Sequence, residues 1–260
     1  TVYETHAPVK KDSLVERFLL GLLIKMSEFK FSILITEALR ERFLDDYPEL
    51  EERILVLPDG AKPISSTVVP IPLRTDSRRM QVGYAGSDLK GKGVDLIVDL
   101  AIRCPNFDFH LVGIYEKDVQ LRFPKVDLPS NLYFYGFRPH REVQRYLLSF
   151  DVLLLPNQIS VFGHGARSDI GQWTSPLKLF EYMAAGKAII CSDVPVLQEV
   201  AEHDQNMLVC RHDKPSEWVG ALLELNSNPQ IRERLGNQAK RQLYSKYSWT
   251  KRCSFVLDNL

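Results

Sequence analysis

The 260-residue sequence contains no run of apolar residues that approaches the roughly 20 needed to cross a membrane. The best candidate is the short stretch 18–24, which is flanked by Glu16, Arg17 and Lys25. We expect it to form a buried amphipathic helix, with contact to a membrane surface as the alternative. An excess of one charge is also lacking, because Lys and Arg together number 33 and Asp and Glu also number 33. No overall basic field exists to attract nucleic acid, so any phosphate group must be held at a local site.

Cysteine is scarce, and the four residues Cys104, Cys191, Cys210 and Cys253 show no C-x-x-C spacing. Most of them lie in apolar surroundings, which favours reduced, buried thiols and a cytoplasmic protein. The sequence also lacks an initiator methionine and a signal peptide, and it opens on a strand-like stretch. We therefore expect a chain that begins inside a domain. Internal repeats and low-complexity tracts are absent.

The composition, 45% hydrophobic and 25% charged, is that of an ordinary globular protein. From Met80 onward, short apolar strands alternate with helical patterns. We expect strands at 82–84, 107–112, 132–135, 152–155, 188–191 and 207–210, and helices at 94–102, 141–148, 177–185, 197–201, 217–225 and 229–247. This alternation predicts an α/β fold with a parallel sheet and helices on both faces. Ligands of such sheets bind at the carboxyl ends of the strands.

The first 60 residues show the same alternation at smaller scale. We expect a strand end at residues 2–3, a helix at 14–29, a strand at 32–35, a helix at 37–43 and a strand at 54–57, closed by a turn at Asp59 and Gly60. Residues 61–77 contain three prolines and no sustained period, so they are the predicted linker.

A glycine-rich loop from Gly86 to Gly93 follows the first strand of the regular region and precedes a helix. Free backbone N–H groups and the helix dipole favour an anion at such a place, which predicts a phosphate site. The spacing G-x-x-x-x-G-K is also that of a nucleotide-triphosphatase loop, but Gly93 stands where that motif needs a Ser or Thr for Mg²⁺. A glycine-rich turn with solvated lysines is the alternative of about equal weight.

The helix between Ser175 and Gly186 has clear boundary signals. Ser175 suits an N-cap, Pro176 suits the first helical position, and Gly186 suits a left-handed C-terminal stop. The first turn can therefore offer free N–H groups to a diphosphate.

Residues Leu177, Phe180 and Ala184 of this helix share one face and are expected to contact the core. Lys178 and Glu181 share another face. The Glu181 carboxylate can accept hydrogen bonds from a vicinal diol such as a ribose. An ordinary surface Lys–Glu pair is the alternative.

These segments together resemble the family-4 type of retaining glycosyltransferases, whose GT-B architecture pairs two Rossmann-like domains. The resemblance is carried by residues 82–86, 92–95, 131–136, 151–156, 175–186 and 247–249, and upstream by residues 2–6, 36–40 and 57–60. It implies a partial N-terminal, acceptor-side domain with its linker at 1–68, a C-terminal donor-nucleotide domain at 69–245, and a C-terminal helix at 246–260.

The resemblance also implies the reaction. A sugar would pass from a nucleoside diphosphate donor to a hydroxyl of a glycan, lipid-linked or small-molecule acceptor, with retention of configuration and without a metal ion or cofactor, as in polysaccharide biosynthesis. Two alternatives stay open. One is a non-catalytic module that binds nucleotide sugars, and the other is a Mg²⁺-dependent NTPase built on the glycine-rich loop.

Site residues carry over from the resemblance position by position. Ser87, Lys92, Ser175, Pro176 and Leu177 would bind the donor diphosphate, Glu181 the ribose, and His6 would lie across the cleft near the sugar as a catalytic candidate. Further contacts with the sugar or the base are expected from Gly86, Arg138, Gly163, His164, Gly165, Trp173 and Lys178.

Two positions depart from the family pattern. Ser87 stands where an arginine is common, so Lys90 or Arg138 would have to supply the second positive charge. Trp173 stands at the first glutamate of the family's E-x(7)-E motif. Among the histidines, His110 lies in an apolar strand and is expected in the core, whereas His140, His203 and His212 are too scattered for a metal cluster.

Overall fold

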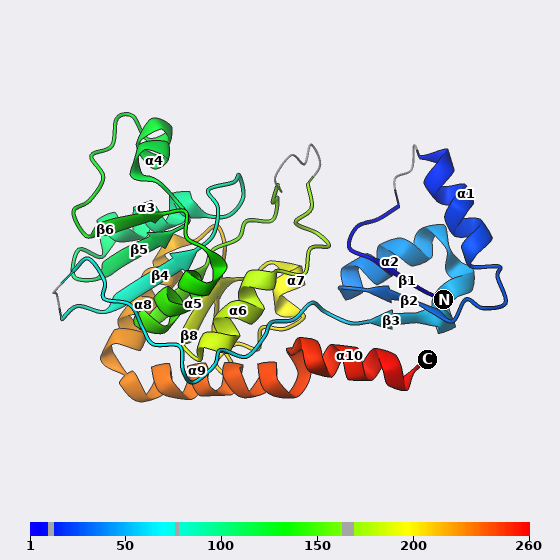
Figure 1. Ribbon diagram of the computed structural model, residues 1–260. Helices are drawn as coiled ribbons and strands as arrows, with labels where there is room; N and C mark the ends of the chain where they lie inside the picture. The colour runs from blue at the N-terminus through cyan, green and yellow to red at the C-terminus, as the bar shows by residue number, and fades with distance from the viewer. Residues whose placement is uncertain (10–12, 76–77, 163–168) are drawn as a thin grey trace.

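The computed structural model describes residues 1–9, 13–75, 78–162 and 169–260. Two parallel sheets organise the described chain (Figure 1). A three-stranded sheet of order β1-β2-β3 forms the N-terminal lobe, residues 1–56, and a six-stranded sheet of order β6-β5-β4-β7-β8-β9 forms the larger lobe, residues 81–247. The predicted α/β fold, with a parallel main sheet and a second α/β unit before it, is confirmed.

The N-terminal lobe has the elements that the sequence predicted and one more. Its elements are β1 (Val2–Thr5), α1 (Leu14–Leu23), β2 (Phe31–Leu34), α2 (Glu37–Asp46), a 3₁₀ helix (Pro48–Arg53) and β3 (Ile54–Val56). Helix α1 ends six residues earlier than predicted. The guanidinium of Arg53 explains this end, because it donates hydrogen bonds to the backbone carbonyls of Ile24 and Phe29 and lies over the Phe29 ring.

The expected burial of α1 is wrong for most of the helix. Leu20 is its one buried residue, whereas Leu14, Val15, Phe18, Leu19 and Leu22 are each more than half exposed. In Figure 1 the helix lies at the outer end of the N-terminal lobe. None of the helices in the described part of the chain is long and apolar enough to cross a membrane.

The larger lobe has the strand order of a doubly wound Rossmann-like sheet, in which the direction of winding reverses between β4 and β7. Its elements are β4 (Gln81–Ala85), α3 (Val94–Arg103), β5 (Asp108–Val112), α4 (Glu116–Arg122), β6 (Leu132–Gly136), α5 (His140–Ser149), β7 (Val152–Leu155), α6 (Leu177–Ala185), β8 (Ala188–Ser192), α7 (Pro195–Gln198), β9 (Leu208–Cys210), α8 (Pro215–Ser227) and α9 (Pro229–Gln242). All neighbouring strands pair in parallel.

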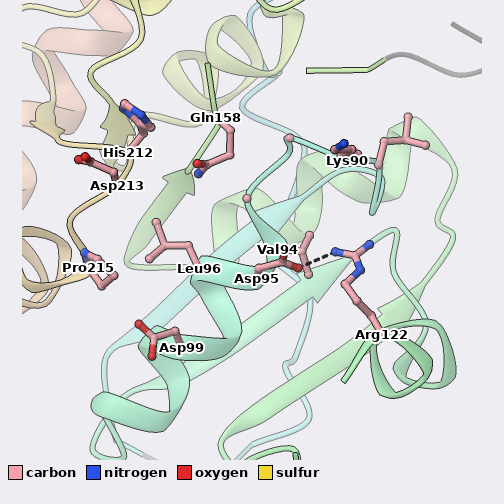
Figure 2. Close-up of a pocket in the computed structure, with 13 residues that line it drawn as sticks. Lys90, Val94, Asp95, Leu96, Asp99, Arg122, Gln158, His212, Asp213 and Pro215 are labelled. Carbon is pink, nitrogen blue, oxygen red and sulfur yellow. Dashed lines mark hydrogen bonds and ion pairs between the residues drawn. The ribbon is translucent and has the colours of Figure 1, made fainter. Parts of the chain in front are cut away.

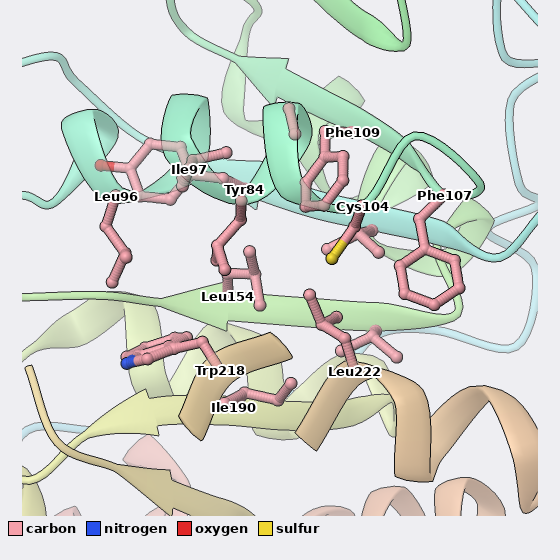
Figure 3. Packing of buried hydrophobic residues seen from close by; sticks show 14 of the residues in the cluster. Tyr84, Leu96, Ile97, Cys104, Phe107, Phe109, Leu154, Ile190, Trp218 and Leu222 are labelled. Carbon is pink, nitrogen blue, oxygen red and sulfur yellow. The ribbon is translucent and has the colours of Figure 1, made fainter. Parts of the chain in front are cut away.

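Buried side chains cover both faces of this sheet because its strands are apolar at nearly every position. One cluster packs α3 and α8 against the sheet around Tyr84, Leu154 and Trp218 (Figure 3). The other packs α5, α6 and α9 against the opposite face. His110 lies in β5 with no exposed surface, and its ring nitrogens lie 3.0 Å from Tyr135 Oη and 2.7 Å from Gln81 Oε1. The prediction of a satisfied core histidine is confirmed.

Three helical predictions for the larger lobe need correction. Helix α4 was missed because its seven residues bury only Val119, which leaves no apolar period to detect. Helix α7 begins at Pro195 rather than at residue 197, since proline fits the first helical turn. The last predicted helix stops at Gln242 and continues as a π-helical turn (Leu243–Tyr247), after which Ser248 caps a separate helix, α10 (Trp249–Asp258).

The linker and α10 connect the two lobes. The linker packs on the larger lobe, where Ile71 exchanges hydrogen bonds with the Ser149 hydroxyl through both its N–H and its carbonyl. Helix α10 runs back beneath the N-terminal lobe (Figure 1), and Arg252 donates to Glu4 at 2.8 Å.

Candidate functional site

The glycine-rich loop joins β4 to α3 and lies against the segment that follows β7. At Gly93 the backbone has φ +76, and a Cβ atom there would lie 1.9 Å from the carbonyl oxygen of Pro156. A serine or threonine at this position would therefore clash with the backbone. Gly93 serves a close approach between two chain segments, and the loop lacks the hydroxyl that a magnesium-dependent triphosphatase would use.

A cavity of about 520 Å³ lies on one side of this loop (Figure 2). Lys90, Asp95, Arg122 and His212 are among its lining residues. Its charged groups already have partners, since Arg122 contacts Asp95 at 2.7 Å and His212 Nδ1 lies 2.8 Å from Asp193. Lys90, one of the two expected sources of a second positive charge, lies on this side with its ammonium over the Phe162 ring.

A larger cavity, of about 710 Å³, opens at the carboxyl ends of β4, β5 and β6, and we call it the sheet-edge cavity. It is lined by Ala85, Gly86, Ser87, Asp88, Leu89, Val112, Gly113, Ile114, Tyr115, Asp118, Phe137, Arg138, His140, Val143, Lys178 and Glu181. The edge of the sheet is the one that the alternating pattern predicted. Of the residues expected to contact the donor, Gly86, Ser87, Arg138, Lys178 and Glu181 line this cavity, whereas Lys92, Ser175, Pro176 and Leu177 are not among its lining residues.

Lys178 lines this cavity, and the charge of Lys92, which is not among the lining residues, acts on it. Lys178 of α6 extends across Gly86, and its Nζ donates to Tyr84 Oη at 2.9 Å. Burial lowers the pKa of Lys178 to about 7, and the positive charge of Lys92 on the loop lowers it as well. Burial also lowers the pKa of Lys92. Among the described residues no carboxylate lies within ion-pair distance of either ammonium, so this place favours an added anion.

Glu181 lies one turn further along α6 and contributes its carboxylate to the same cavity. Its Oε1 lies 3.6 Å from His140 Nδ1, and burial raises the pKa of Glu181 against the opposing charges of His140 and Lys178. The expected alternative, a surface pair between Glu181 and Lys178, is not formed, because Lys178 Nζ points to Tyr84. A partly buried carboxylate without a hydrogen-bond donor in the described chain is suited to accept a diol.

The start of α6 differs from the prediction. The helix begins at Leu177, Pro176 occupies the N-cap position, and no side chain caps the helix. The Ser175 hydroxyl instead accepts a hydrogen bond from the backbone N–H of Asp59, 116 residues earlier. The Ser175 hydroxyl thus makes a tertiary contact instead of a local cap, and no side chain among the described residues accepts from the first N–H groups of α6. The expected C-terminal stop at Gly186, with φ +67, is confirmed.

Leu177 was expected to face the core and is half exposed, so that prediction is wrong. It lines a further cavity of about 350 Å³ between the linker, α5, α6 and Trp249. His140, Val143 and Glu181 line both this cavity and the sheet-edge cavity, so the two adjoin. Phe180 and Ala184 are buried as predicted.

His6 lies at the end of β1 on the N-terminal lobe, within a small charged group. Its Nε2 lies 2.9 Å from Glu4 Oε1, and Glu4 also accepts from Arg252. The buried Asp59 is close enough for its pKa to respond to His6 and Arg252, both of which oppose the rise caused by burial. Because the Asp59 N–H binds Ser175, this group lies near the start of α6.

Trp173 lies apart from the sheet-edge cavity. Its side chain packs against the core of the N-terminal lobe, and its backbone carbonyl accepts a hydrogen bond from the Thr36 hydroxyl at 3.1 Å. Gly163, His164 and Gly165, the remaining expected contacts, lie outside the described residues.

The sequence analysis missed four side chains that line the sheet-edge cavity. Tyr115, Asp118, Phe137 and His140 follow β5 and β6 within a few residues. Their position just beyond two predicted strands was the available signal, because the carboxyl ends of parallel strands share one edge of the sheet. His140 was considered only as a metal ligand; no group of metal-binding side chains occurs among the described residues.

A site of this kind, with cations and a carboxylate at the edge of a doubly wound sheet, is that of a nucleotide-binding Rossmann-like domain. Residues 71–242 match the model of the glycosyl transferases group 1 family, and the chain belongs to this family. The relatives include the uncharacterized glycosyltransferase MJ1178 of Methanocaldococcus jannaschii, which is 28% identical over 171 residues, or 65% of this chain and 44% of the relative. The chain thus spans less than half the length of that relative.

Solved glycosyltransferases share the fold at low sequence identity. Anabaena Alr3699/HepE in complex with UDP superposes with a TM-score of 0.73 at 16% identity, covering 100% of this chain and 72% of that protein. S. aureus TarM, crystallised with Fondaparinux, alpha-GlcNAc-glycerol and UDP, superposes with a TM-score of 0.68 at 18% identity, covering 94% and 46%. The two-lobed GT-B arrangement expected from the sequence is therefore confirmed.

Proposed function

We propose that this chain contributes the donor site of a glycosyltransferase that moves a sugar from UDP to a hydroxyl group, with retention of anomeric configuration and without a metal ion. The observation that carries the proposal is the convergence of Lys178, Glu181 and the glycine-rich loop on one cavity of about 710 Å³. Retention of the anomeric configuration is inferred from membership in the family. The choice of UDP rests on its presence in the solved relative HepE, which has also been crystallised with UDP-glucose.

The proposed roles follow from charge and position. Lys92 and Lys178 neutralise the diphosphate, together with Ser87 and the N–H groups at the start of α6. Glu181 accepts the ribose hydroxyls, while Tyr115, Phe137 and Arg138 border the part of the cavity available to the base. Breaking the sugar–phosphate bond moves negative charge onto the diphosphate, so fixed positive groups there stabilise the transition state.

His6 is proposed to act on the sugar side, from the N-terminal lobe. It lies on the N-terminal lobe near the start of α6, and its Nε2 lies 2.9 Å from Glu4 Oε1. The acceptor is proposed to be a glycan, a lipid-linked hydroxyl or a small molecule. We also propose domain boundaries at residues 68 and 245. A cytoplasmic location is proposed as well, and the four free cysteines support it.

A donor screen followed by a turnover assay tests the proposal. Thermal shifts are measured with UDP-, GDP- and dTDP-sugars, because a ligand at a hundred times its dissociation constant adds about 2.7 kcal/mol of stability. Radiolabelled UDP-sugar is then incubated with and without hydroxyl acceptors. Transfer or slow donor hydrolysis supports the proposal. UDP-sugar binding with neither reaction favours the non-catalytic binding module, and Mg²⁺-dependent ATP turnover that needs Lys92 favours the NTPase.

A further inference from the structure

The sheet-edge cavity is lined by a lysine, Lys178, whose ammonium has no carboxylate at ion-pair distance among the described residues. Lys178 belongs to α6, yet its ammonium leaves the helix and lies over the first residue of the glycine-rich loop. A Cβ atom added to Gly86 would lie 2.0 Å from Lys178 Nζ, so the loop admits this ammonium only because residue 86 has no side chain. The ammonium also lies 4.1 Å from the centre of the Tyr84 ring, whose hydroxyl accepts its hydrogen bond.

The hydrogen bonds around Lys178 leave its remaining donors to the cavity. Tyr84 Oη donates its own proton to the backbone carbonyl of Ser87 at 2.9 Å, so the Tyr84 oxygen can accept from Lys178. This bond uses one of the three N–H donors of an ammonium. The described chain gives Lys178 Nζ no other hydrogen bond, although the group lines a cavity large enough for a nucleotide.

The charges that face Lys178 do not neutralise it. The charge of Lys92 on the loop acts on Lys178, and among the described residues Glu181 supplies the opposing negative charge, at longer range than an ion pair. Asp88 on the same loop is bound by Arg122 at 2.7 Å, and His140 of α5 lies beside Glu181. Burial raises the pKa of both neighbouring phenols, Tyr84 and Tyr182, so they stay neutral.

We propose that Lys178 is the second cation of the diphosphate site, and that its amine takes up a proton from solvent as the donor binds. This inference rests on the proposed function of the cavity. The positive charge of Lys92 acts on Lys178, which has no carboxylate at ion-pair distance among the described residues, and the negative charge of a bound diphosphate would offset that repulsion. The sequence analysis expected Lys90 or Arg138 to supply this second positive charge. Lys90 faces the other cavity, whereas Arg138 bonds Tyr146 and the carbonyl of Phe137.

Proton uptake follows from the pKa of Lys178, which burial and Lys92 lower to about 7 in the free protein. A bound diphosphate raises that pKa, so the amine gains a proton at any pH between the two values. Uptake is expected to be partial near pH 7 and to approach one proton as the pH rises above 7. Above pH 7 donor affinity should therefore fall, approaching tenfold per pH unit, whereas below pH 7 this group should contribute little pH dependence.

Calorimetry with UDP-glucose measures this uptake directly. A sugar nucleotide is the right probe because its diphosphate has no proton that titrates near neutral pH. The binding heat is measured at pH 8 in HEPES and in Tris, whose different ionisation heats reveal the protons exchanged. The wild type should take up close to one proton. Lys178→Met should abolish the uptake and weaken UDP-glucose by about 10- to 100-fold while leaving uridine binding unchanged.

Two further lysine variants complete the test. Lys90→Met, on the same loop but facing the other cavity, should keep both affinity and uptake. Lys92→Met should weaken UDP-glucose and reduce the uptake at pH 8 in part, because loss of the Lys92 charge raises the pKa of Lys178 while burial still lowers it. Uptake that persists in Lys178→Met, or UDP-glucose binding by the wild type without uptake, overturns this inference and leaves the proposed function intact. Failure of the wild type to bind UDP-glucose overturns both.

Discussion

Replacement of Glu181 by glutamine separates ligand recognition from stability. The carboxylate lines the sheet-edge cavity and has no hydrogen-bond donor among the described residues, because His140 Nδ1 lies 3.6 Å away. Both oxygens are therefore available to a ribose diol. Glutamine keeps one acceptor oxygen and loses the charge that strengthens its bonds, which should weaken UDP binding by about 1–3 kcal/mol, or about 5- to 150-fold.

The same substitution should leave the melting temperature unchanged or slightly raised. Burial raises the pKa of Glu181, so its ionised form is less favourable in the folded protein than in the unfolded chain. The assay is calorimetric titration with UDP and with its 2′,3′-dideoxy analogue, alongside a thermal melt. Glu233→Gln, an exposed residue of α9, is the matched control and should change neither quantity.

Two results would refute this reasoning. The dideoxy analogue lacks the diol, so it should bind the wild type and Glu181→Gln with equal affinity. If Glu181→Gln weakened binding of the analogue as strongly as it weakens binding of UDP, Glu181 would not contact the ribose. A large fall in melting temperature would show instead that the carboxylate supports the fold.

Three further predictions concern the loop and the core. Lys92→Ala should weaken UDP by about 1.5–3 kcal/mol in calorimetry and leave uridine unchanged, and equal losses for both would assign Lys92 to the fold. Gly93→Ser should lower the melting temperature by at least about 4 °C, because the added Cβ would lie 1.9 Å from the carbonyl oxygen of Pro156. The variant should also show no Mg²⁺-dependent ATP turnover. A variant that is as stable as the wild type and hydrolyses ATP would contradict both expectations. Burial lowers the pKa of His110 to about 4, so between pH 6.5 and pH 4 the imidazole is protonated in the unfolded chain but not in the folded protein. The free energy of unfolding, measured with denaturant, should therefore fall by up to about 3 kcal/mol as the pH falls from 6.5 to 4. His110→Gln should flatten that slope, and an unchanged slope would show that His110 is not its source.

The donor side of the site was largely predictable, because its parts lie in continuous segments. The loop from Gly86 to Lys92 and the helix with Glu181 each carry a local signal, and strand alternation brings both to one sheet edge. The roles of these residues remain predictions. The side chains after β5 and β6 were missed, since nothing in their local pattern distinguishes Tyr115 or Phe137 from ordinary loop residues.

The sequence by itself determined the α/β fold, because apolar periodicity and glycine or proline boundaries act over a few residues. Only the tertiary structure decided which groups meet. It directs Ser175 to Asp59 instead of to its own helix, places Trp173 on the N-terminal lobe and brings Lys178 over Gly86. These contacts join residues up to 137 positions apart, as Thr36 and Trp173 show. Local propensity carries no information about such partners, since they are fixed by packing of the whole sheet and the burial it produces.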